Sequence, residues 1–206
     1  MKIYKYKNYE EYIEIQKMAN KRKIKNSYVD KNSLLGVIRY LYEDRKMSPE
    51  LVLCHGTRRG DEQKYFIQGF DIFNLKPKVI GTEISDNAGQ FPNTIEWDFH
   101  IAKDEWIGNV DIIYTNSFDH SPKPKECLDI WMSCLKENGV CIIEYSDVCD
   151  SKSGRIDCFG ATLDEYKEFI TKKYDIVDIL TNEGIPDAGL SHKGDRWYII
   201  IKNRKL

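Results

Sequence analysis

The stretch ELVLCHGTRRGDEQ, residues 50–63, decides the fold of this chain. Its first part, LVLC, is a short apolar run of the kind that forms a buried strand. Gly56 and Gly60 then space a turn that carries two arginines, and acidic residues open the segment that follows as a helix. A strand, a glycine-spaced turn and a helix in this order predict the first unit of an α/β sheet. In such sheets, ligands bind beyond the carboxyl ends of the strands, which is where this turn would lie.

The chain after residue 50 alternates strand and helix patterns. Strands are predicted at residues 51–54, 78–83, 110–115 and 140–145, with a weaker one at 94–97. The segment KECLDIWMSCL has the apolar spacing of a helix face, and ATLDEYKEFI begins with a capping-box pattern, Thr162 followed by Glu165. Two further strand patterns, YDIVDIL and RWYIIIK, end the chain with no helix between them. Because such a connection suits antiparallel neighbours, we expect an α/β sandwich whose last strand opposes a parallel sheet.

Length and composition narrow the class of protein. The 206 residues suit a single domain, and 31 Lys and Arg against 33 Asp and Glu give a net charge of −2, so nucleic acid is not an expected partner. We find no signal-like N-terminus and no apolar window long enough for a membrane span, so no membrane partner is expected either. Six cysteines without a CxxC pair indicate a reducing compartment and argue against zinc. These features predict a cytoplasmic protein.

Residues 1–48 differ in charge from the rest, with 12 Lys and Arg against 6 Asp and Glu and seven of the thirteen tyrosines. A basic segment with interleaved aromatic residues can bind nucleic acid. However, SLLGVIRYLY places Leu34, Val37, Ile38 and Leu41 at helical spacing, which buries one face. We therefore expect one domain over residues 1–206, with an N-terminal helical cap over 1–48 and the α/β core over 49–206.

Two features of the core indicate a ribose-containing ligand. Glu83 ends the second predicted strand, where a carboxylate can accept hydrogen bonds from both ribose hydroxyls; a solvated carboxylate at a strand end is the alternative. Nicotinamide dinucleotides and S-adenosylmethionine both contain ribose. Arg58 stands where a dinucleotide site keeps a small residue, and an arginine suits a carboxylate such as that of a methionine moiety. The alternative for Arg58 is a pairing with Asp61 or Glu62 that braces the turn.

From about Glu50 to Lys202 the chain resembles the class I S-adenosylmethionine-dependent methyltransferases. The family's acidic-x-Gly-x-Gly-x-Gly motif falls on Cys54, Gly56, Arg58 and Gly60, so two of its usual residues are replaced. The resemblance implies a Rossmann-like three-layer sandwich, with a seven-stranded, mostly parallel sheet and an antiparallel last strand. S-adenosyl-L-methionine is the cofactor it implies. The spacing of Leu128, Trp131, Leu135 and Gly139 after the segment TNSFDHS also matches the family.

The resemblance also implies the residues that contact the cofactor. The ribose-binding acid falls on Glu83, and the adenine-contacting pair falls on Asp98 and Phe99 of WDF. The full predicted cofactor set is His55, Gly56, Thr57, Arg58, Gly60, Glu83, Ile84, Asp98, Phe99 and Asn116. More narrowly, GTRRGDE together with NSFDHS is similar to small methyltransferases among the glycan-building enzymes of bacteria and large DNA viruses.

The segment NSFDHSPKP follows the fourth predicted strand and is where chemistry is expected. His120 can take up a proton near neutral pH, so it is the candidate general base, and Asp119 can orient it or bind an acceptor hydroxyl. A structural role for His120 is the alternative. We expect His55 and His100 to support the turn and the loop after Asp98, while His192 can reach a substrate from the rim.

A divalent metal is possible but not favoured. The oxygen-bearing side chains expected at the ends of the fourth and fifth strands are Asn116 and Glu144, with Asp147 nearby. Such ligands suit magnesium or calcium. Asn116, however, replaces the carboxylate that metal-dependent members of the family have there, so the predicted site has no metal.

The sequence therefore predicts an S-adenosylmethionine-dependent O-methyltransferase that acts on a hydroxyl of a sugar, a glycan or another small molecule. One alternative is a nicotinamide-dependent oxidoreductase, which Arg58 and the helix-free final hairpin disfavour. The other alternative is a binding module that keeps the fold without catalysis, since two motif residues are replaced.

Overall fold

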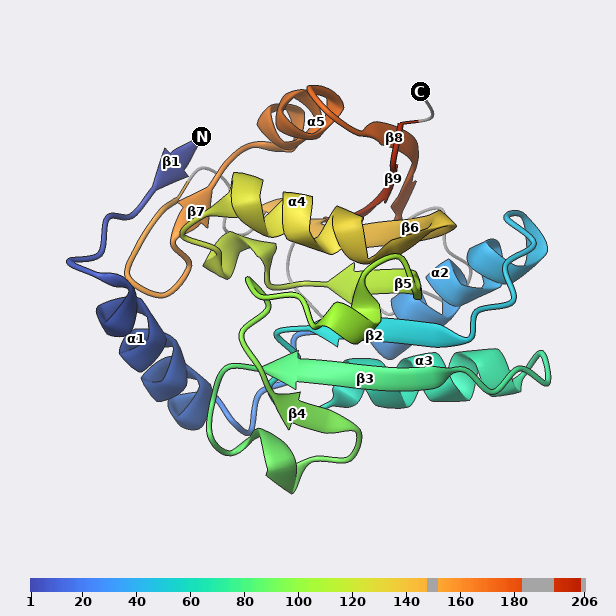
Figure 1. Ribbon diagram of the computed structural model, residues 1–206, viewed down its shortest axis with the longest axis horizontal. Coiled ribbons are helices and arrows are strands. Elements are labelled where there is room, and N and C mark those ends of the chain that lie inside the picture. The colour runs from blue at the N-terminus through green and yellow to red at the C-terminus, as the bar shows by residue number, and fades with distance from the viewer. Residues whose placement is uncertain (148–151, 183–194, 205–206) are drawn as a thin grey trace.

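The computed structural model describes residues 1–147, 152–182 and 195–204. Its centre is a seven-stranded sheet with the order β4-β3-β2-β5-β6-β9-β8 (Figure 1). The strands are β2 (Leu51–His55), β3 (Lys78–Glu83), β4 (Thr94–Glu96), β5 (Val110–Thr115), β6 (Leu135–Ser146), β8 (Asp175–Thr181) and β9 (Arg196–Lys202). β9 runs antiparallel to both β6 and β8, whereas β2 to β6 pair in parallel. The predicted Rossmann-like sheet with an antiparallel last strand is confirmed.

Helices cover both faces of the sheet and make three layers. α2 (Lys31–Glu43) and α3 (Asp61–Asp71) pack on one face, against side chains such as Cys54 and Ile142. α4 (Pro124–Cys134) and α5 (Leu163–Thr171) pack on the other, against Ile113 and Ile143. Because each central strand is buried on both faces, the strands read in the sequence as continuous apolar runs.

The N-terminal residues divide between two places. α2 buries Leu34, Val37, Ile38 and Leu41 on the sheet, as the helical spacing predicts. α1 (Tyr9–Arg22) instead lies beside the carboxyl ends of β3 and β4 (Figure 1). A small second sheet, β1 (Lys2–Ile3) with β7 (Phe159–Gly160), ties the N-terminus to the loop after β6. The division of the domain at residue 48 stays a prediction.

Three short 3₁₀ helices lie in the connections between strands. η1 (Ala88–Gln90) connects β3 to β4, η2 (Asp104–Trp106) connects β4 to β5, and η3 (Phe118–His120) precedes α4. η3 follows β5 directly and therefore brings the predicted catalytic segment to the carboxyl edge of the sheet. Among the described residues, no helix is both long enough and apolar enough to cross a membrane.

The predicted capping box of α5 forms in full. Thr162 Oγ1 accepts a hydrogen bond from the Glu165 backbone N–H at 3.1 Å, and Glu165 accepts one from the Thr162 N–H at 2.9 Å. Two N–H groups that the helix itself cannot satisfy are thus bonded.

We expect Thr162→Ala to lower the free energy of unfolding by about 1 kcal/mol, because it removes an N-cap acceptor. Urea denaturation measures this loss. Thr171→Ala is the matched control at the other end of the helix, where the hydroxyl donates to the carbonyls of Lys167 and Glu168 and caps no N–H group. Equal effects of the two substitutions would contradict the capping role.

Candidate functional site

The glycine-spaced turn after β2 brings two segments of the chain into close contact. Gly56 has a positive φ of 71°, and a Cβ atom at this position would lie 2.6 Å from the Cβ atom of Ser117. The Gly56 N–H donates to the Thr82 carbonyl, and Ser117 Oγ donates to the Gly56 carbonyl. Only glycine allows this approach. Gly60, with φ of 82°, then ends the turn and caps α3.

Glu83 lies at the end of β3, and its side chain is hydrogen-bonded to the backbone of this turn. Its carboxylate accepts hydrogen bonds from the backbone N–H groups of Arg58 at 2.9 Å and Ser85 at 3.2 Å. Burial raises the pKa of Glu83 above its ordinary value, although these two hydrogen bonds act in the opposite direction. The carboxylate is therefore buried and placed at the strand end that the ribose prediction requires, and not solvated as the alternative assumed.

The two arginines of the turn have different partners. Arg59 pairs with Asp61 at 2.9 Å, so it braces the turn. The guanidinium of Arg58 lies over the Tyr28 ring, 4.8 Å from its centroid, and donates to the Asn26 carbonyl at 3.3 Å. Its Nε is buried and has no hydrogen-bond partner within the described part of the chain. The arginine that pairs with Asp61 and braces the turn is thus Arg59. Arg58, for which this pairing was the alternative, lines the site instead.

A small cavity of about 50 Å³ collects several of the predicted cofactor residues. Its wall includes Gly56, Arg58, Glu83, Ile84, Asp98 and Phe99. The opposite wall comes from α1, through Tyr12, Gln16, Ala19 and Asn20. Residues from the ends of β2, β3 and β4 therefore converge on one space, and α1 closes it.

The contacts of α1 with the β3–β4 edge are mostly polar. Lys17 pairs with Glu96 at 3.2 Å and Lys21 with Asp86 at 2.8 Å, all with substantially exposed side chains. Exposed ion pairs of this kind contribute little stability, typically below about 1 kcal/mol each. The packing of α1 therefore rests more on its buried side chains, Tyr12, Ile15 and Ala19, than on these ion pairs.

Asp98 is held in place by Tyr9 and His100. Tyr9 Oη donates to Asp98 Oδ2 at 2.5 Å, and His100 Nδ1 lies 2.8 Å from Oδ1. Burial alone would raise the pKa of Asp98, but the hydrogen bonds from His100 and Tyr9 outweigh it and the pKa falls below its ordinary value. His100 also bonds Ser121 Oγ at 2.9 Å, so it supports the loop after Asp98.

His55 and Thr57 lie deeper than the rest of the predicted set. His55 Nδ1 bonds Thr82 Oγ1 at 2.8 Å, and its ring stacks on Trp131 with 5.0 Å between centroids. Burial, helped by His100, lowers the pKa of His55 to about 3, so the ring is neutral. His55 lines neither this small cavity nor the larger cavity described next. It therefore supports the turn from the core. Thr57 is buried and accepts a hydrogen bond from Gln63.

A second cavity, of about 600 Å³, adjoins the first. The two share Gly56, Arg58, Ser117, His120 and Lys23. The larger one extends past Asn116 and Asp119 to a wall formed by Tyr145, Phe159, Ala161 and Tyr166. A ligand bound in the first cavity can thus reach a second molecule in the other, with His120 at their junction.

His120 is oriented by a residue of α1. Gln16 Nε2 donates to the Ile156 carbonyl at 2.9 Å, which fixes the amide so that its Oε1 faces His120 Nδ1, also at 2.9 Å. In the neutral ring this contact places the proton on Nδ1 and leaves the lone pair on Nε2. Nε2 lies 3.5 Å from Asp157 Oδ1 and 3.9 Å from Asp119 Oδ1.

The carboxylates around His120 form the one group of described residues with metal-ligand spacing. Asp119, His120 and Asp157 each offer a ligand atom, and these atoms lie within 4.8 Å of one another. Burial raises the pKa of Asp119, which the positive charge of a protonated His120 would oppose.

The metal set considered from the sequence is not assembled in this structure. Glu144 receives hydrogen bonds from Tyr114 and from Arg196, with which it forms a buried ion pair. Asn116 donates to Glu62 at 3.3 Å, and the exposed Asp147 accepts from the Asp195 N–H. Because Arg196 already neutralises Glu144, these residues do not fit a cation site. His192 lies outside the described residues.

Glu62, in the first turn of α3, is a site residue that the sequence analysis considered only as a partner of Arg58. It lines the larger cavity, its side chain is only 5% exposed, and its Oε2 has no hydrogen-bond partner among the described residues. Burial raises the pKa of Glu62 to about 8. An acidic residue in a first helical turn is ordinarily solvated, so the pattern gave no sign of this burial.

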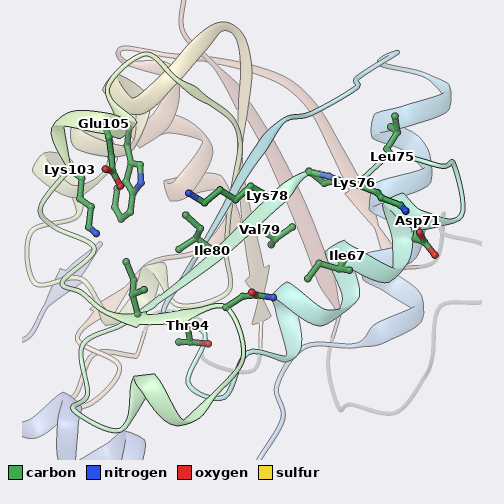
Figure 2. Close-up of a pocket in the computed structure, with 14 residues that line it drawn as sticks. Ile67, Asp71, Leu75, Lys76, Lys78, Val79, Ile80, Thr94, Lys103 and Glu105 are labelled. Atoms are coloured by element: carbon green, nitrogen blue, oxygen red, sulfur yellow. The ribbon is translucent and has the colours of Figure 1, made fainter.

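A third hollow, of about 720 Å³, lies away from these residues. It is formed along β3, β4 and α3, where Lys78, Ile80 and Lys103 face it (Figure 2). Lys78 and Thr94 begin their strands, so the hollow lies toward the amino ends of the parallel strands. None of the predicted site residues lines it. Ligands of α/β sheets bind at the opposite ends, and we place the site there.

The fold is shared with known methyltransferases. No protein-family model matches the sequence, and a search of curated proteins found no match. Among solved structures, the chain is similar to 1,6-didemethyltoxoflavin-N1-methyltransferase of Burkholderia thailandensis, with bound 1,6-didemethyltoxoflavin and S-adenosylhomocysteine. The TM-score is 0.68 at 14% identity, over 98% of this chain and 93% of that one.

Two further structures have the same architecture. The plantazolicin methyltransferase BpumL, in complex with a desmethyl analogue and SAH, has a TM-score of 0.65 at 16% identity, over 95% of this chain and 98% of that one. A TehB-like SAM-dependent methyltransferase from Corynebacterium glutamicum has a TM-score of 0.55 at 12% identity, over 96% of this chain and 100% of that one. The chain therefore has the class I methyltransferase fold. The narrower resemblance to glycan-building or viral enzymes gains no support from these comparisons.

The buried carboxyl of Glu62 makes stability depend on pH. Its pKa is about 8 in the folded protein against an ordinary 4.5, so the folded state keeps a proton that the unfolded chain releases. Stability is therefore fully present below pH 4.5 and falls as the pH rises toward 8. We expect Glu62→Gln to match the wild type at pH 5 and to exceed it at pH 9, by up to about 4 kcal/mol, since a pKa unit is worth about 1.4 kcal/mol. Urea unfolding at both pH values measures this difference, and parallel pH profiles would contradict it.

Proposed function

We propose that this protein is an S-adenosylmethionine-dependent methyltransferase that methylates a hydroxyl group of a small molecule. The observation that carries the proposal is the junction of the two cavities. Glu83, Asp98 and Phe99 line the smaller one, and His120 stands where it meets the larger one. A nucleoside-binding set and a proton acceptor thus share one edge of a methyltransferase fold.

The residues of this edge fit the cofactor in chemistry. Gly56 lets the backbone approach a ligand closely, Glu83 offers a carboxylate at a strand end, and Arg58 retains an unpaired Nε for an anionic group. The smaller cavity lies between the ends of β2, β3 and β4 and the helix α1, so a nucleoside bound there would contact both.

The proposed reaction is an in-line displacement. Bound S-adenosylmethionine supplies a methyl group whose bond to sulfur breaks as the bond to the acceptor oxygen forms, which leaves a neutral thioether. His120 Nε2 takes up the hydroxyl proton, because Gln16 keeps the other ring proton on Nδ1. Asp119 and Asp157 then stabilise the positive charge that His120 acquires.

A sugar or glycan hydroxyl is the acceptor that the sequence resemblance favours. The lining of the larger cavity supports a small polar acceptor, since it combines polar residues such as Asn26, Ser146 and Asp157 with the aromatic residues Tyr145, Phe159 and Tyr166. The Burkholderia thailandensis enzyme is named as an N1-methyltransferase, so its acceptor atom is a nitrogen. Nitrogen acceptors are therefore the competing class for the same cavity.

Calorimetry and a transfer assay test this proposal in turn. Titration with S-adenosylhomocysteine and with NAD separates a methyltransferase from an oxidoreductase, and we expect binding of the first ligand only. Incubation with methyl-labelled S-adenosylmethionine and panels of sugars and heteroaromatic amines then identifies the acceptor class. Binding without transfer to any panel member would favour a binding module, and transfer to nitrogen alone would overturn the hydroxyl assignment.

We expect Glu83→Ala to weaken S-adenosylhomocysteine binding by about 1.5 to 3 kcal/mol, the scale of hydrogen bonds to a charged group. Calorimetry at pH 7.5 measures the change, and circular dichroism shows whether the variant folds. Glu96→Ala is the matched control, since Glu96 ends the neighbouring strand and its side chain is exposed. Unchanged affinity in a folded Glu83→Ala protein would exclude the ribose assignment.

We expect His120→Asn to lower turnover about a hundredfold or more while leaving cofactor affinity almost unchanged. Asparagine can hydrogen-bond to Gln16 but cannot accept a proton at neutral pH, so the variant separates positioning from base catalysis. Single-turnover rates and calorimetry on the same preparation measure the two effects. A variant that binds cofactor and keeps most of the wild-type rate would refute the role of His120 as base.

A further inference from the structure

Part of the positive charge of the N-terminal segment lies at the larger cavity. The helical spacing of α2 accounts for apolar residues of this segment, but not for its 12 Lys and Arg against 6 Asp and Glu. The loop between α1 and α2 supplies four residues to the wall of the larger cavity, namely Lys23, Asn26, Ser27 and Tyr28. This loop is bonded to the turn after β2, because Arg58 donates to the Asn26 carbonyl and Arg59 to the Lys25 carbonyl.

The loop presents hydrogen-bond donors that lack an acceptor. Lys23 is half-buried, its Nζ lies 5.8 Å from the centroid of the Tyr28 ring, and no ion pair joins it to a described residue. The guanidinium of Arg58 lies 4.8 Å from the centroid of the same ring, so two positive charges lie around Tyr28. Ser27 Oγ is buried and has no hydrogen-bond partner in the described part of the chain. An ammonium group and a hydroxyl on one wall suit a ligand that brings negatively charged oxygen atoms.

The acidic residues that line the larger cavity do not neutralise Lys23. Two of them form ion pairs with arginines, Asp61 with Arg59 and Glu144 with Arg196. Glu62 keeps its proton at neutral pH, since its pKa is about 8. The remaining two, Asp119 and Asp157, lie beside His120. Burial raises the pKa of Asp119, and Lys23 opposes this rise less than His120 does, so Lys23 is not the main partner of that carboxyl group.

We propose that the methyl acceptor is an acidic molecule, whose phosphate or carboxylate group binds Lys23 and the hydroxyl of Ser27 while one of its own hydroxyl groups faces His120. This inference rests on the proposed function, because it narrows the acceptor of the same cavity. Phosphate and carboxylate oxygens accept hydrogen bonds from ammonium and hydroxyl groups, and the bond to a charged donor is the stronger one. Lys23 and His120 line both cavities, so one small molecule can reach both side chains. Phosphorylated sugars and sugar acids have this chemistry.

Competition between matched neutral and acidic ligands tests the assignment. The ligands are glucose, galactose and mannose, each as the neutral sugar, as a phosphate ester and as the uronic acid, together with phenol and hydroxybenzoate. Their dissociation constants are measured by calorimetry on protein saturated with S-adenosylhomocysteine. We expect acidic members to bind about tenfold or more tightly than their neutral counterparts, the scale of one hydrogen bond to a charged group.

Variants of the loop assign this preference to its residues. Lys23→Gln should abolish most of the preference for the acidic members, and Ser27→Ala should weaken their binding by about threefold. Lys25→Gln is the matched control, because Lys25 belongs to the same loop, is exposed and lines neither cavity. A preference for phosphates alone or for carboxylates alone would support the proposal and identify the anionic group.

The remaining outcomes separate this inference from the proposed function. A wild-type protein that does not bind S-adenosylhomocysteine would refute the proposed function itself. Binding of S-adenosylhomocysteine without binding of any acidic member, or with equal affinity for neutral and acidic members, would overturn this inference alone. Equal losses in Lys23→Gln and Lys25→Gln would also overturn it, because only the total charge would then matter. If Lys23→Gln weakened S-adenosylhomocysteine and left the acidic members unaffected, Lys23 would belong to the cofactor and the assignment would be wrong.

Discussion

The close approach of the turn after β2 to the segment after β5 is the contact on which the whole site depends. Gly56 and Ser117 meet at a distance that leaves no room for a Cβ atom on residue 56. The same turn is bonded through its backbone to Thr82 of β3. Three neighbouring strands are thereby tied together at their carboxyl ends. As a consequence, the residues that follow each strand open into adjoining cavities, and a ligand can touch all of them at once.

The acidic residues of this site are all affected by burial, but they differ in their hydrogen-bond and ion-pair partners. Burial raises the pKa of Glu62, Glu83, Asp119 and Glu144. Glu144 has an arginine and a tyrosine, Glu83 has two backbone N–H groups, and Asp119 lies beside an imidazole. Glu62 has a single amide donor. All four are carboxyl groups in one small region, but only Glu144 is held in an ion pair with an arginine. The other three have weaker or fewer partners and are available to a ligand.

The sequence predicted the sheet well because strands that are buried on both faces consist of continuous apolar runs. All seven strand patterns formed strands, and Thr162 and Glu165 were enough to predict the capping box of α5. The position of Glu83 followed from the rule that ligand residues come at the ends of strands, whereas Asp98 was expected only from the family resemblance. Gln16, Asp157 and the burial of Glu62 could not be predicted, because each depends on contacts between segments far apart in the chain. A glutamine on an amphipathic helix gives no sign that it will fix the tautomer of a histidine.

α1 takes part in two features of this edge of the sheet, the wall of the smaller cavity and the orientation of the His120 ring. Its buried apolar residues, Tyr12, Ile15 and Ala19, belong to neither of the two core clusters, whereas those of α2 lie at the centre of one. Moving α1 therefore disturbs less packing than moving α2, and local opening needs less free energy than global unfolding. Gln16 is part of the same helix, and its Oε1 lies 2.9 Å from His120 Nδ1. A change in the position of α1 would therefore act on the wall of the smaller cavity and on the orientation of this imidazole together.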